Sequence, residues 1–388
     1  MTPLPITAWS AVNALGRSTE EVLAGLDASR SGLGASPFPL TMETFVGAMP
    51  GELAALPEEH AAYDTRLARI AWLAFEELRS RLLGAVERWG GARVAVILGT
   101  STGGLEHTEQ AFGHWLEHAT IPPAFDFARQ HNFAALGELL ASVVGATGPV
   151  YVVSTACSSS GKVAASASRL IEAGLADAVL IGGIDSLTRM TLQGFHSLGI
   201  LSSSRCRPFS SLRDGINIGE GAAFLLVERE AADAEVCVLG VGESADAYRM
   251  SSPEPSGRGA REAMERALEQ AGMSAREIDH VNAHGTATPL NDAAESLALE
   301  ALFGDRVPIA STKGYTGHLL GGAGGTEMVF ALHAITSGRI PATLGADPVD
   351  EAVNIHVATT AIETPVRRVL SNSFAFGGSN VSVLLGSR

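Results

Sequence analysis

The spacing of hydrophobic residues predicts a repeated succession of helices and strands. In residues 65–83, apolar side chains recur from Leu67 to Leu78 at the spacing of a helix with one buried face. An apolar run at residues 93–99 predicts a strand, and the Gly/Thr-rich residues 100–104 predict the loop after it.

The same order of elements occurs again in the second part of the chain. Residues 257–273 have helical spacing, and residues 278–285 predict a strand that runs into the loop 286–289. The predicted strand and loop at residues 150–160 lead into a helix that ends near Gly174. Residues 307–318 repeat this pattern before a helix that ends near Gly338. This repetition predicts two related mixed α/β halves that pack face to face.

The boundary between the halves is predicted in the polar residues 228–236. Each half closes with an apolar strand, at residues 222–228 in the first and residues 381–386 in the second. We therefore assign residues 1–232 to an N-terminal half and residues 233–388 to a C-terminal half.

Composition narrows the class of protein. The chain has 388 residues, of which 46% are hydrophobic, enough to build the core of one or two domains. Its net charge of −15 argues against nucleic acid as a partner, because neutralising phosphates requires clustered Lys and Arg. No segment approaches the roughly 18 consecutive apolar residues that span a bilayer, so we expect no membrane insertion.

The cysteine content indicates a reducing compartment. The three cysteines, Cys157, Cys206 and Cys237, are an odd and sparse set, which argues against a disulfide framework. The first 16 residues lack the basic and apolar segments of a secretory signal. We therefore expect a cytoplasmic protein.

Cys157 stands at a corner between a predicted strand and a predicted helix. If residues 158–174 are helical, unpaired N–H groups and the helix dipole at their start favour the nucleophilic thiolate. The alternative is a buried structural cysteine, which is the commoner role of a free cysteine. This segment alone favours that alternative, and Cys206 and Cys237 lack any such setting.

Three further polar side chains lie on Gly/Thr-rich loops after predicted strands. His284 lies on one loop, and Lys313 and His318 lie on another, which the repeat aligns with the loop of Cys157. Glu327, at the start of an Ala/Gly-rich helix, is a candidate partner for Lys313, because a buried charge requires a counter-charge. Each residue alone has a structural explanation, as a core histidine or a solvated lysine. Their convergence on corresponding loops favours a shared site.

Five motifs in a fixed order give the chain a family resemblance. They are STACSSS, RPFSSLRDGINIGEGAA, NAHGTATPLND, STKGYTGHLLGGAGG and NSFAFGGSN. With them the chain resembles the β-ketoacyl-acyl-carrier-protein synthases, the condensing enzymes of fatty acid and polyketide assembly, over nearly its whole length. The resemblance implies an α/β, thiolase-like fold, layered αβαβα and built from two related halves, in agreement with the repeat.

The resemblance also implies roles for individual residues. Cys157 matches the nucleophile that accepts the acyl chain, and Phe376 matches a gating residue whose N–H forms an oxyanion hole with that of Cys157. His284 and His318 match the pair that drives malonyl decarboxylation. The other matches are Lys313 and Glu327, which support the histidines electrostatically; Thr286 and Thr288, which bind the phosphopantetheine arm; and Asp292 and Glu295, the acidic positions after the first histidine motif.

The implied partner is acyl carrier protein, whose phosphopantetheine arm carries the substrates. No metal and no other cofactor is implied, and no metal-binding motif is present. The basic residues that could dock the carrier are the cluster Arg205, Arg207 and Arg213 and, as weaker candidates, Arg66 and Arg69. The alternative role for the cluster is structural ion pairing, and Asp214 is the only acid near it in sequence.

Two positions depart from the family pattern. Ser210 stands where the family usually has Asp, and Ile216 stands where Phe is common. We expect both positions to lie away from the catalytic residues and to affect loop packing or the choice of acyl chain.

Finer features resemble the ketosynthases of bacterial aryl-polyene pigment clusters, namely the motifs at residues 242–260, 282–296 and 370–380. This resemblance implies an aryl-capped polyene chain and a heterodimer with a chain-length-factor-like homologue that lacks the cysteine. The alternative is a housekeeping fatty acid elongation synthase that acts as a homodimer. A degradative thiolase would need a second catalytic cysteine near the C-terminus, a starter-type synthase pairs Cys with His and Asn, and a chain-length factor would have lost Cys157.

Overall fold

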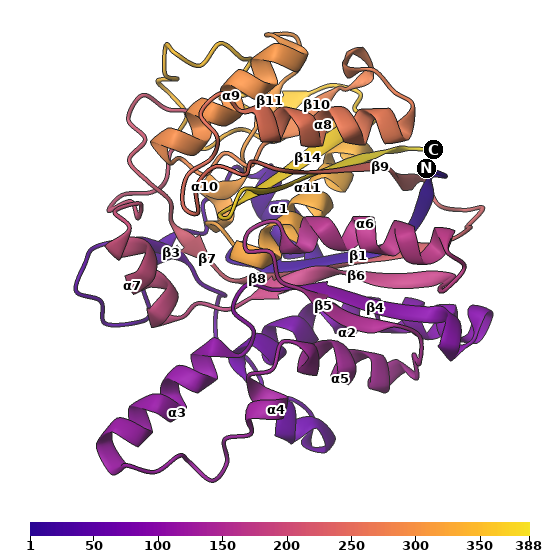
Figure 1. The fold of residues 1–388 in the computed structure, drawn as a ribbon, viewed down its shortest axis with the longest axis vertical. Helices are drawn as coiled ribbons and strands as arrows, with labels where there is room; N and C mark the ends of the chain where they lie inside the picture. Colours follow the sequence, from indigo (N-terminus) through magenta and orange to yellow (C-terminus); the bar gives the residue numbers. More distant parts are fainter.

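The computed structural model describes all 388 residues and contains a mixed sheet of ten strands (Figure 1). Strand β1 pairs antiparallel with β8 on one side and with β9 on the other, so the strands of both halves form one continuous sheet. In spatial order the strands are β11 (Ile309–Ala310), β10 (His280–Asn282), β14 (Arg368–Ala375), β15 (Ser379–Ser387), β9 (Val236–Ala245), β1 (Leu4–Asn13), β8 (Gly221–Glu228), β6 (Ala178–Asp185), β4 (Val94–Gly99) and β5 (Val150–Val153).

A pair of helices separates the two halves of this sheet. Helices α6 (Ser159–Glu172) and α11 (Ala323–Ser337) contact each other and strands of both halves. Helices α2 (Arg66–Trp89) and α5 (Ala134–Val144) cover the outer face of the N-terminal strands (Figure 1). Helices α8 (Arg258–Ala271) and α9 (Pro289–Phe303) cover the outer face of the C-terminal strands. These five layers confirm the predicted αβαβα, thiolase-like architecture.

The remaining elements connect or flank these layers. Helix α3 extends away from the body of the molecule (Figure 1). These elements are the helices α1 (Thr19–Asp27), α3 (Leu105–His118), α4 (Phe127–Gln130), α7 (Arg189–Ser197) and α10 (Lys313–Thr316), the short strands β2 (Gly34–Ala35), β3 (Phe45–Gly47), β7 (Ile218–Gly219), β12 (Arg339–Ile340) and β13 (Ile362–Glu363), and four 3₁₀ turns at Glu58–Tyr63, Gly91–Arg93, Ala275–Glu277 and Leu320–Gly322.

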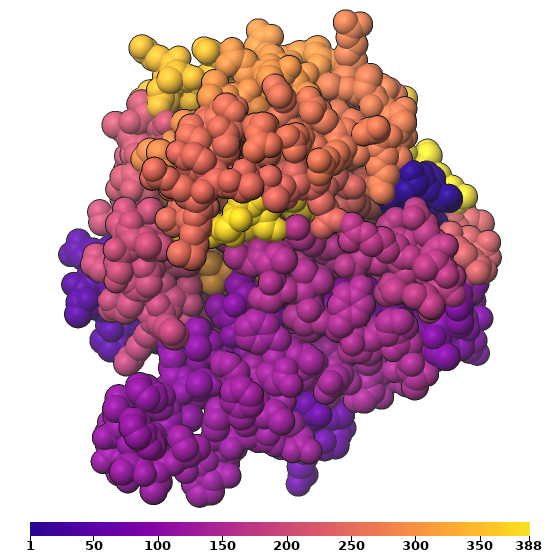
Figure 2. Space-filling view, viewed as in Figure 1, coloured from indigo at the N-terminus to yellow at the C-terminus, as the bar shows by residue number.

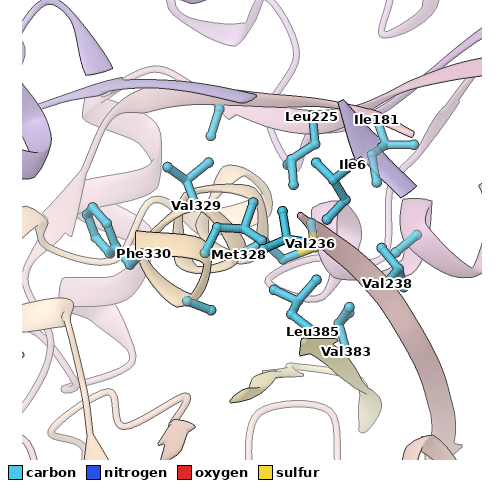
Figure 3. Close-up of a cluster of buried hydrophobic side chains, with 14 of the residues drawn as sticks. Ile6, Ile181, Leu225, Val236, Val238, Met328, Val329, Phe330, Val383 and Leu385 are labelled. Atoms are coloured by element: carbon cyan, nitrogen blue, oxygen red, sulfur yellow. The ribbon is translucent and has the colours of Figure 1, made fainter. Parts of the chain in front are cut away.

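The largest hydrophobic cluster fills the space between the two halves. Figure 3 shows Met328 and Val329 of α11 between strands of the N-terminal half, represented by Leu225, and strands of the C-terminal half, represented by Val383 and Leu385. Because α11 is buried on all sides, its sequence is apolar or small at nearly every position. The halves therefore share one core.

The predicted elements are present, with shifted ends. Helix α2 begins after Thr65, whose hydroxyl accepts a hydrogen bond from the Ala68 N–H. It continues six residues beyond the predicted end and stops at Gly90, whose φ of 83° is left-handed. The strand predicted at residues 278–285 is confined to β10, because the chain turns into a loop at His284.

The predicted boundary at residues 232 and 233 lies in the connection between β8 and β9. In the space-filling view, the N-terminal half forms the lower part and the C-terminal half the upper part, with the C-terminal strands in yellow visible where they meet (Figure 2). None of the helices combines the length and the apolar character that crossing a membrane requires.

Glycines permit the close approach of the two central helices. A Cβ at Gly324 in α11 would lie 2.8 Å from the Gly161 nitrogen in α6 and 2.8 Å from Ser373 Oγ in β14. Neither a backbone nitrogen in a helix nor a buried hydroxyl can move freely, so a methyl group has no room there. Gly113 in α3, by contrast, has open space around the position of a Cβ.

We expect Gly324→Ala to lower the free energy of unfolding. Alanine is favoured over glycine in a helix by about 1 kcal/mol, but overpacking a filled core costs about 1–3 kcal/mol. Gly113→Ala is the matched control, and it should be neutral or stabilising. Urea denaturation of the whole chain measures both variants, and equal stabilisation by the two substitutions would contradict the close packing.

Candidate active site

Cys157 lies in the turn between β5 and α6, as predicted, and its side chain is buried. The preceding residue, Ala156, has a φ of 51°, a left-handed conformation that side chains rarely adopt. The turn is held by hydrogen bonds from the Thr155 N–H to Ser159 Oγ, at 2.9 Å, and from the Ser159 N–H to the Ala156 carbonyl, at 3.1 Å. Small residues on both sides of the cysteine allow this sharp turn.

The expected thiolate at Cys157 is wrong for this structure. Burial raises the pKa of the Cys157 thiol to about 12, which outweighs the attraction of the Lys313 charge. Hydrogen bonds from the backbone N–H groups of Phe376 and of Cys157 itself act in the opposite direction and lower the pKa. The thiol is therefore protonated at neutral pH.

His284 lies on the loop that follows β10, and two buried carboxylates hold this loop. Glu295 Oε1 accepts a hydrogen bond from the His284 N–H at 2.8 Å, and Glu295 Oε2 accepts one from the Gly285 N–H at 2.7 Å. Asp292 accepts hydrogen bonds from the N–H groups of Ala287, at 3.1 Å, and Phe209, at 2.8 Å. Both acidic positions that follow the first histidine motif thus fix the backbone of the histidine loop.

His318 faces His284 across the site. The two ring centroids are 5.2 Å apart and the ring planes are nearly perpendicular, at 83°. Burial lowers the pKa of both imidazoles well below 6.5, and the nearby Lys313 charge lowers both pKa values further. Both histidines are therefore neutral. His284 Nδ1 and both ring nitrogens of His318 are buried and have no hydrogen-bond partner within the protein.

Lys313 and Glu327 form a buried ion pair beside the histidines. Their side chains are 3% and 4% exposed, and the Lys313 ammonium contacts Glu327 Oε1. Lys313 Nζ also donates a hydrogen bond to the His284 carbonyl oxygen at 2.8 Å. The lysine therefore connects both histidine-bearing segments, and its charge is balanced within the fold.

A cavity of about 250 Å³ joins these residues. Its polar wall includes Cys157, His284 and His318 together with Thr286 and Thr288, whose hydroxyl oxygens are 2.9 Å apart. Lys313, Glu327, Asp292 and Glu295 lie behind this wall and support it. Its apolar wall contains Phe195, Ile200, Ile216, Phe374 and Phe376.

Ile216 corrects one expectation from the sequence. We expected this departure from the family pattern to lie away from the catalytic residues, but the side chain lines the cavity that contains Cys157. Phe195 and Ile200 also line it, and the Phe195 and Phe376 ring centroids are 6.0 Å apart. Sequence reasoning missed Phe195 in α7 and Ile200 just after it, because this segment carries no motif. The unusual residue at position 216 was the one signal for this wall.

Three of the five candidate docking arginines are ion-paired. Arg66 Nε donates to the buried Glu220 at 2.8 Å, Arg69 Nε donates to Asp64 at 2.7 Å, and Arg213 Nη1 donates to Asp350 at 2.5 Å. The sequence suggested Asp214 as the acid near Arg213, but Asp214 accepts a hydrogen bond from Ser202 and a more distant residue, Asp350, pairs with the arginine.

Arg205 and Arg207 have no carboxylate partner. The Arg205 guanidinium lies over the Phe45 ring, 5.6 Å from its centroid. No group of three or more His, Cys, Asp or Glu side chains is arranged to bind a metal ion.

A buried thiol and two neutral imidazoles line one cavity, and a buried lysine lies behind them, an arrangement that could serve acyl transfer through a cysteine. Models of the β-ketoacyl synthase N-terminal and C-terminal domains match residues 2–233 and 236–347. The chain is 37% identical over 312 residues to 3-oxoacyl-[acyl-carrier-protein] synthase 2 of Rhizobium meliloti, covering 75% of this chain and 73% of the relative. It is 32% identical over 394 residues to nodulation protein E of the same organism, covering 97% and 96%.

A solved structure has the same fold. A ketosynthase in complex with its chain length factor, from Xenorhabdus doucetiae, superposes with a TM-score of 0.94 at 36% identity, covering 100% of this chain and 98% of that one. The chain therefore belongs to the β-ketoacyl synthase family. It is a 3-oxoacyl-acyl-carrier-protein synthase, an acyltransferase with condensing activity.

Buried neutral histidines make stability depend on pH. His280, whose Nδ1 is 2.9 Å from the Pro308 carbonyl oxygen, is buried, and burial lowers its pKa from 6.5 to about 4. Between these pH values the unfolded chain binds a proton at this position and the folded chain does not. The stability that His280 contributes is therefore complete above pH 6.5 and is lost as the pH falls toward 4.

As the pH falls from 6.5 to 4, we expect the free energy of unfolding of wild type to decrease by about 1.4 kcal/mol per pH unit relative to that of His280→Gln. Urea denaturation at several pH values measures this difference. The control is His118→Gln, which replaces an exposed imidazole on α3. Its free energy of unfolding should change with pH as that of wild type does. A difference that does not change with pH would show that His280 is not held neutral.

Proposed function

We propose that this synthase elongates an aryl-capped polyene chain on acyl carrier protein. The observation that carries the proposal is the convergence of Cys157, His284 and His318 on one cavity with an apolar, partly aromatic wall. Aromatic side chains favour stacking against planar conjugated groups, which supports an aryl polyene over a saturated chain.

In the first step, the Cys157 sulfur attacks the thioester carbonyl of acyl-carrier protein. The carrier thiol leaves with a proton, and the acyl group remains on the cysteine. The backbone N–H groups of Phe376 and Cys157, which act on the thiol in the resting site, would stabilise the oxyanion of the tetrahedral intermediate. Because the resting thiol is protonated, its proton must leave as the carbon–sulfur bond forms.

In the second step, malonyl-carrier protein loses CO₂, and the resulting enolate attacks the acyl-cysteine carbonyl. A carbon–carbon bond forms and the carbon–sulfur bond breaks, so that 3-oxoacyl-carrier protein is the product. The Cys157 sulfur leaves as a thiolate and takes up one proton from water, which restores the thiol. His284 and His318, held neutral, would donate N–H groups to the enolate oxygen. Holding both acyl groups in one cavity makes this condensation effectively unimolecular.

The residues around this pair have supporting roles in the proposal. Lys313, paired with Glu327, keeps positive charge beside the histidines and so disfavours their protonation. The hydroxyls of Thr286 and Thr288 line the cavity and are suited to bind the phosphopantetheine arm. The synthase would need no metal or other cofactor.

The proposed partners are acyl carrier protein and a second ketosynthase-like subunit. Arg205 and Arg207, which lack carboxylate partners, are the docking candidates for the acidic carrier. Phe112, Trp115 and Leu116 on α3 are 55%, 43% and 65% exposed, and such an apolar patch is typical of a subunit interface. The Xenorhabdus ketosynthase, solved with its chain length factor, supports a heterodimer. We place the enzyme in the cytoplasm, as its sparse, unpaired cysteines suggest.

A housekeeping fatty acid elongation synthase, acting as a homodimer, is the second candidate. Its support is the 37% identity to the Rhizobium synthase. The two candidates share every catalytic residue and differ in acyl chain and partner.

Intact-mass measurement separates the two functions. The purified protein is mixed with acyl carrier protein that bears either an aryl-enoyl group or a saturated medium-length acyl group. We expect a mass gain from the aryl-enoyl carrier, and we expect Cys157→Ala to abolish it. A gain from the saturated carrier alone would favour fatty acid elongation, and a gain that persists in Cys157→Ala would show that the nucleophile is another residue.

A second variant isolates the histidine pair. Cys157→Gln imitates the acylated cysteine, so we expect it to release CO₂ from malonyl-carrier protein without forming a condensation product. Adding His318→Ala to that variant should suppress CO₂ release by at least about 100-fold, the scale expected for loss of an oxyanion donor. Unchanged CO₂ release from the double variant would contradict the role proposed for the pair.

A further inference from the structure

One buried carboxylate outside the site described so far has an unusual number of partners. Asp185, at the end of β6, is fully buried. Its Oδ1 accepts hydrogen bonds from Thr100 Oγ1 at 2.7 Å, from the Thr102 N–H at 2.9 Å and from Thr102 Oγ1 at 2.6 Å. Its Oδ2 accepts hydrogen bonds from the Ser101 N–H at 2.9 Å and from the Gly321 N–H at 2.6 Å. Every partner donates, so the carboxylate form suits this site.

These bonds join two segments that are remote in sequence. Residues 100–102 follow β4, and Gly321 lies three residues after His318. The segments are also in backbone contact, since a Cβ at Gly321 would lie 2.6 Å from the Ser101 nitrogen. Asp185 is therefore the polar link between the His318 segment and the end of β4.

The segment that Asp185 holds is strained. Leu320, between His318 and Gly321, has a φ of 50°, and a bulky side chain in this region is unfavourable. Such a conformation persists only where the surroundings impose it. The His318 backbone is bonded to Asn217 and Gly219 on one side of this turn, and the Gly321 N–H is bonded to Asp185 on the other.

The same region abuts the helix that begins after the nucleophile. A Cβ at Gly99, the last residue of β4, would lie 2.4 Å from the Ser160 nitrogen in α6. Ser160 Oγ in turn accepts a hydrogen bond from the Gly325 N–H at 2.9 Å. The end of β4 thus contacts the Cys157 helix directly and contacts the His318 segment through Asp185.

We propose that Asp185 is a positioning residue, which fixes the His318 segment against the end of β4 and so sets His318 relative to Cys157. The inference deepens the proposed function and rests on it for the role of His318. Asparagine has nearly the same shape, but its NH₂ group replaces one carboxylate oxygen. That group cannot accept the hydrogen bonds that the backbone N–H groups now donate to this oxygen. The His318 turn would then lose the bond that holds Leu320.

The test compares two half-reactions in Asp185→Asn. We expect the decarboxylation of malonyl-carrier protein to fall about 100-fold, the scale of a misplacement near 1 Å. Acylation of Cys157 should not fall, because the Asp185 charge raises the pKa of the thiol and its removal favours the thiolate. The matched control is Asp177→Asn, which should change neither rate. Asp177 lies just before β6 and is ion-paired with Arg93 and Arg229. Equal loss of both half-reactions, or no loss, would overturn the proposal.

A milder variant covers the case in which Asp185→Asn does not fold. Thr102→Val removes one hydroxyl donor and keeps the side-chain shape, and the hydroxyl has no partner other than Asp185. We expect the same selective loss of decarboxylation, about 10-fold. A 10-fold change in rate corresponds to about 1.4 kcal/mol, near the lower end of what a hydrogen bond to a charged group contributes. Equal effects of Thr102→Val on both half-reactions would contradict the positioning role.

A crystal structure of Thr102→Val separates failure of this inference from failure of the proposed function. If wild type neither takes up an acyl group nor releases CO₂, the proposed function fails. The positioning role then still predicts a displaced turn at residues 319–321. An unmoved turn in that crystal structure would overturn the role of Asp185 whatever the activity.

Discussion

The close packing of α6 against α11 is the constraint on which the rest of the structure depends. Both helices are buried between the two halves of the sheet, and glycines at positions 161 and 324 let their backbones approach to contact distance. Larger side chains would separate the helices, and with them the two strand layers. Since Cys157 precedes α6 and His318 precedes α11, this contact also brings Cys157 and a histidine together.

Burial of the site then determines its electrostatics. Desolvation keeps the Cys157 thiol protonated and both imidazoles neutral, and the Lys313 charge reinforces the second effect. A buried lysine requires a counter-charge, which Glu327 provides. In the proposed mechanism these neutral groups would donate hydrogen bonds where negative charge develops, so the site would need little reorganisation during the reaction.

Backbone strain is concentrated in the loops that carry these groups. Ala156, Ala287 and Leu320 each have a positive φ, and they lie next to or within three residues of Cys157, His284 and His318, respectively. At the two histidine loops a buried carboxylate accepts backbone N–H bonds close to the strained residue. Tertiary hydrogen bonds thus maintain local conformations that the chain alone would not favour.

From the sequence alone, periodicity predicted two related α/β halves, and the family resemblance implied their αβαβα layering. Motif spacing predicted that Cys157, His284, Lys313 and His318 share a site, because periodicity and motifs are local properties of the chain. Only the tertiary structure decided the protonation of the thiol, the place of Ile216 in the cavity wall and the pairing of Arg213 with Asp350. It also placed Asp185 between the His318 segment and the end of β4. These features depend on desolvation and on contacts between residues far apart in sequence, such as Arg213 and Asp350, 137 positions apart, which no local pattern records.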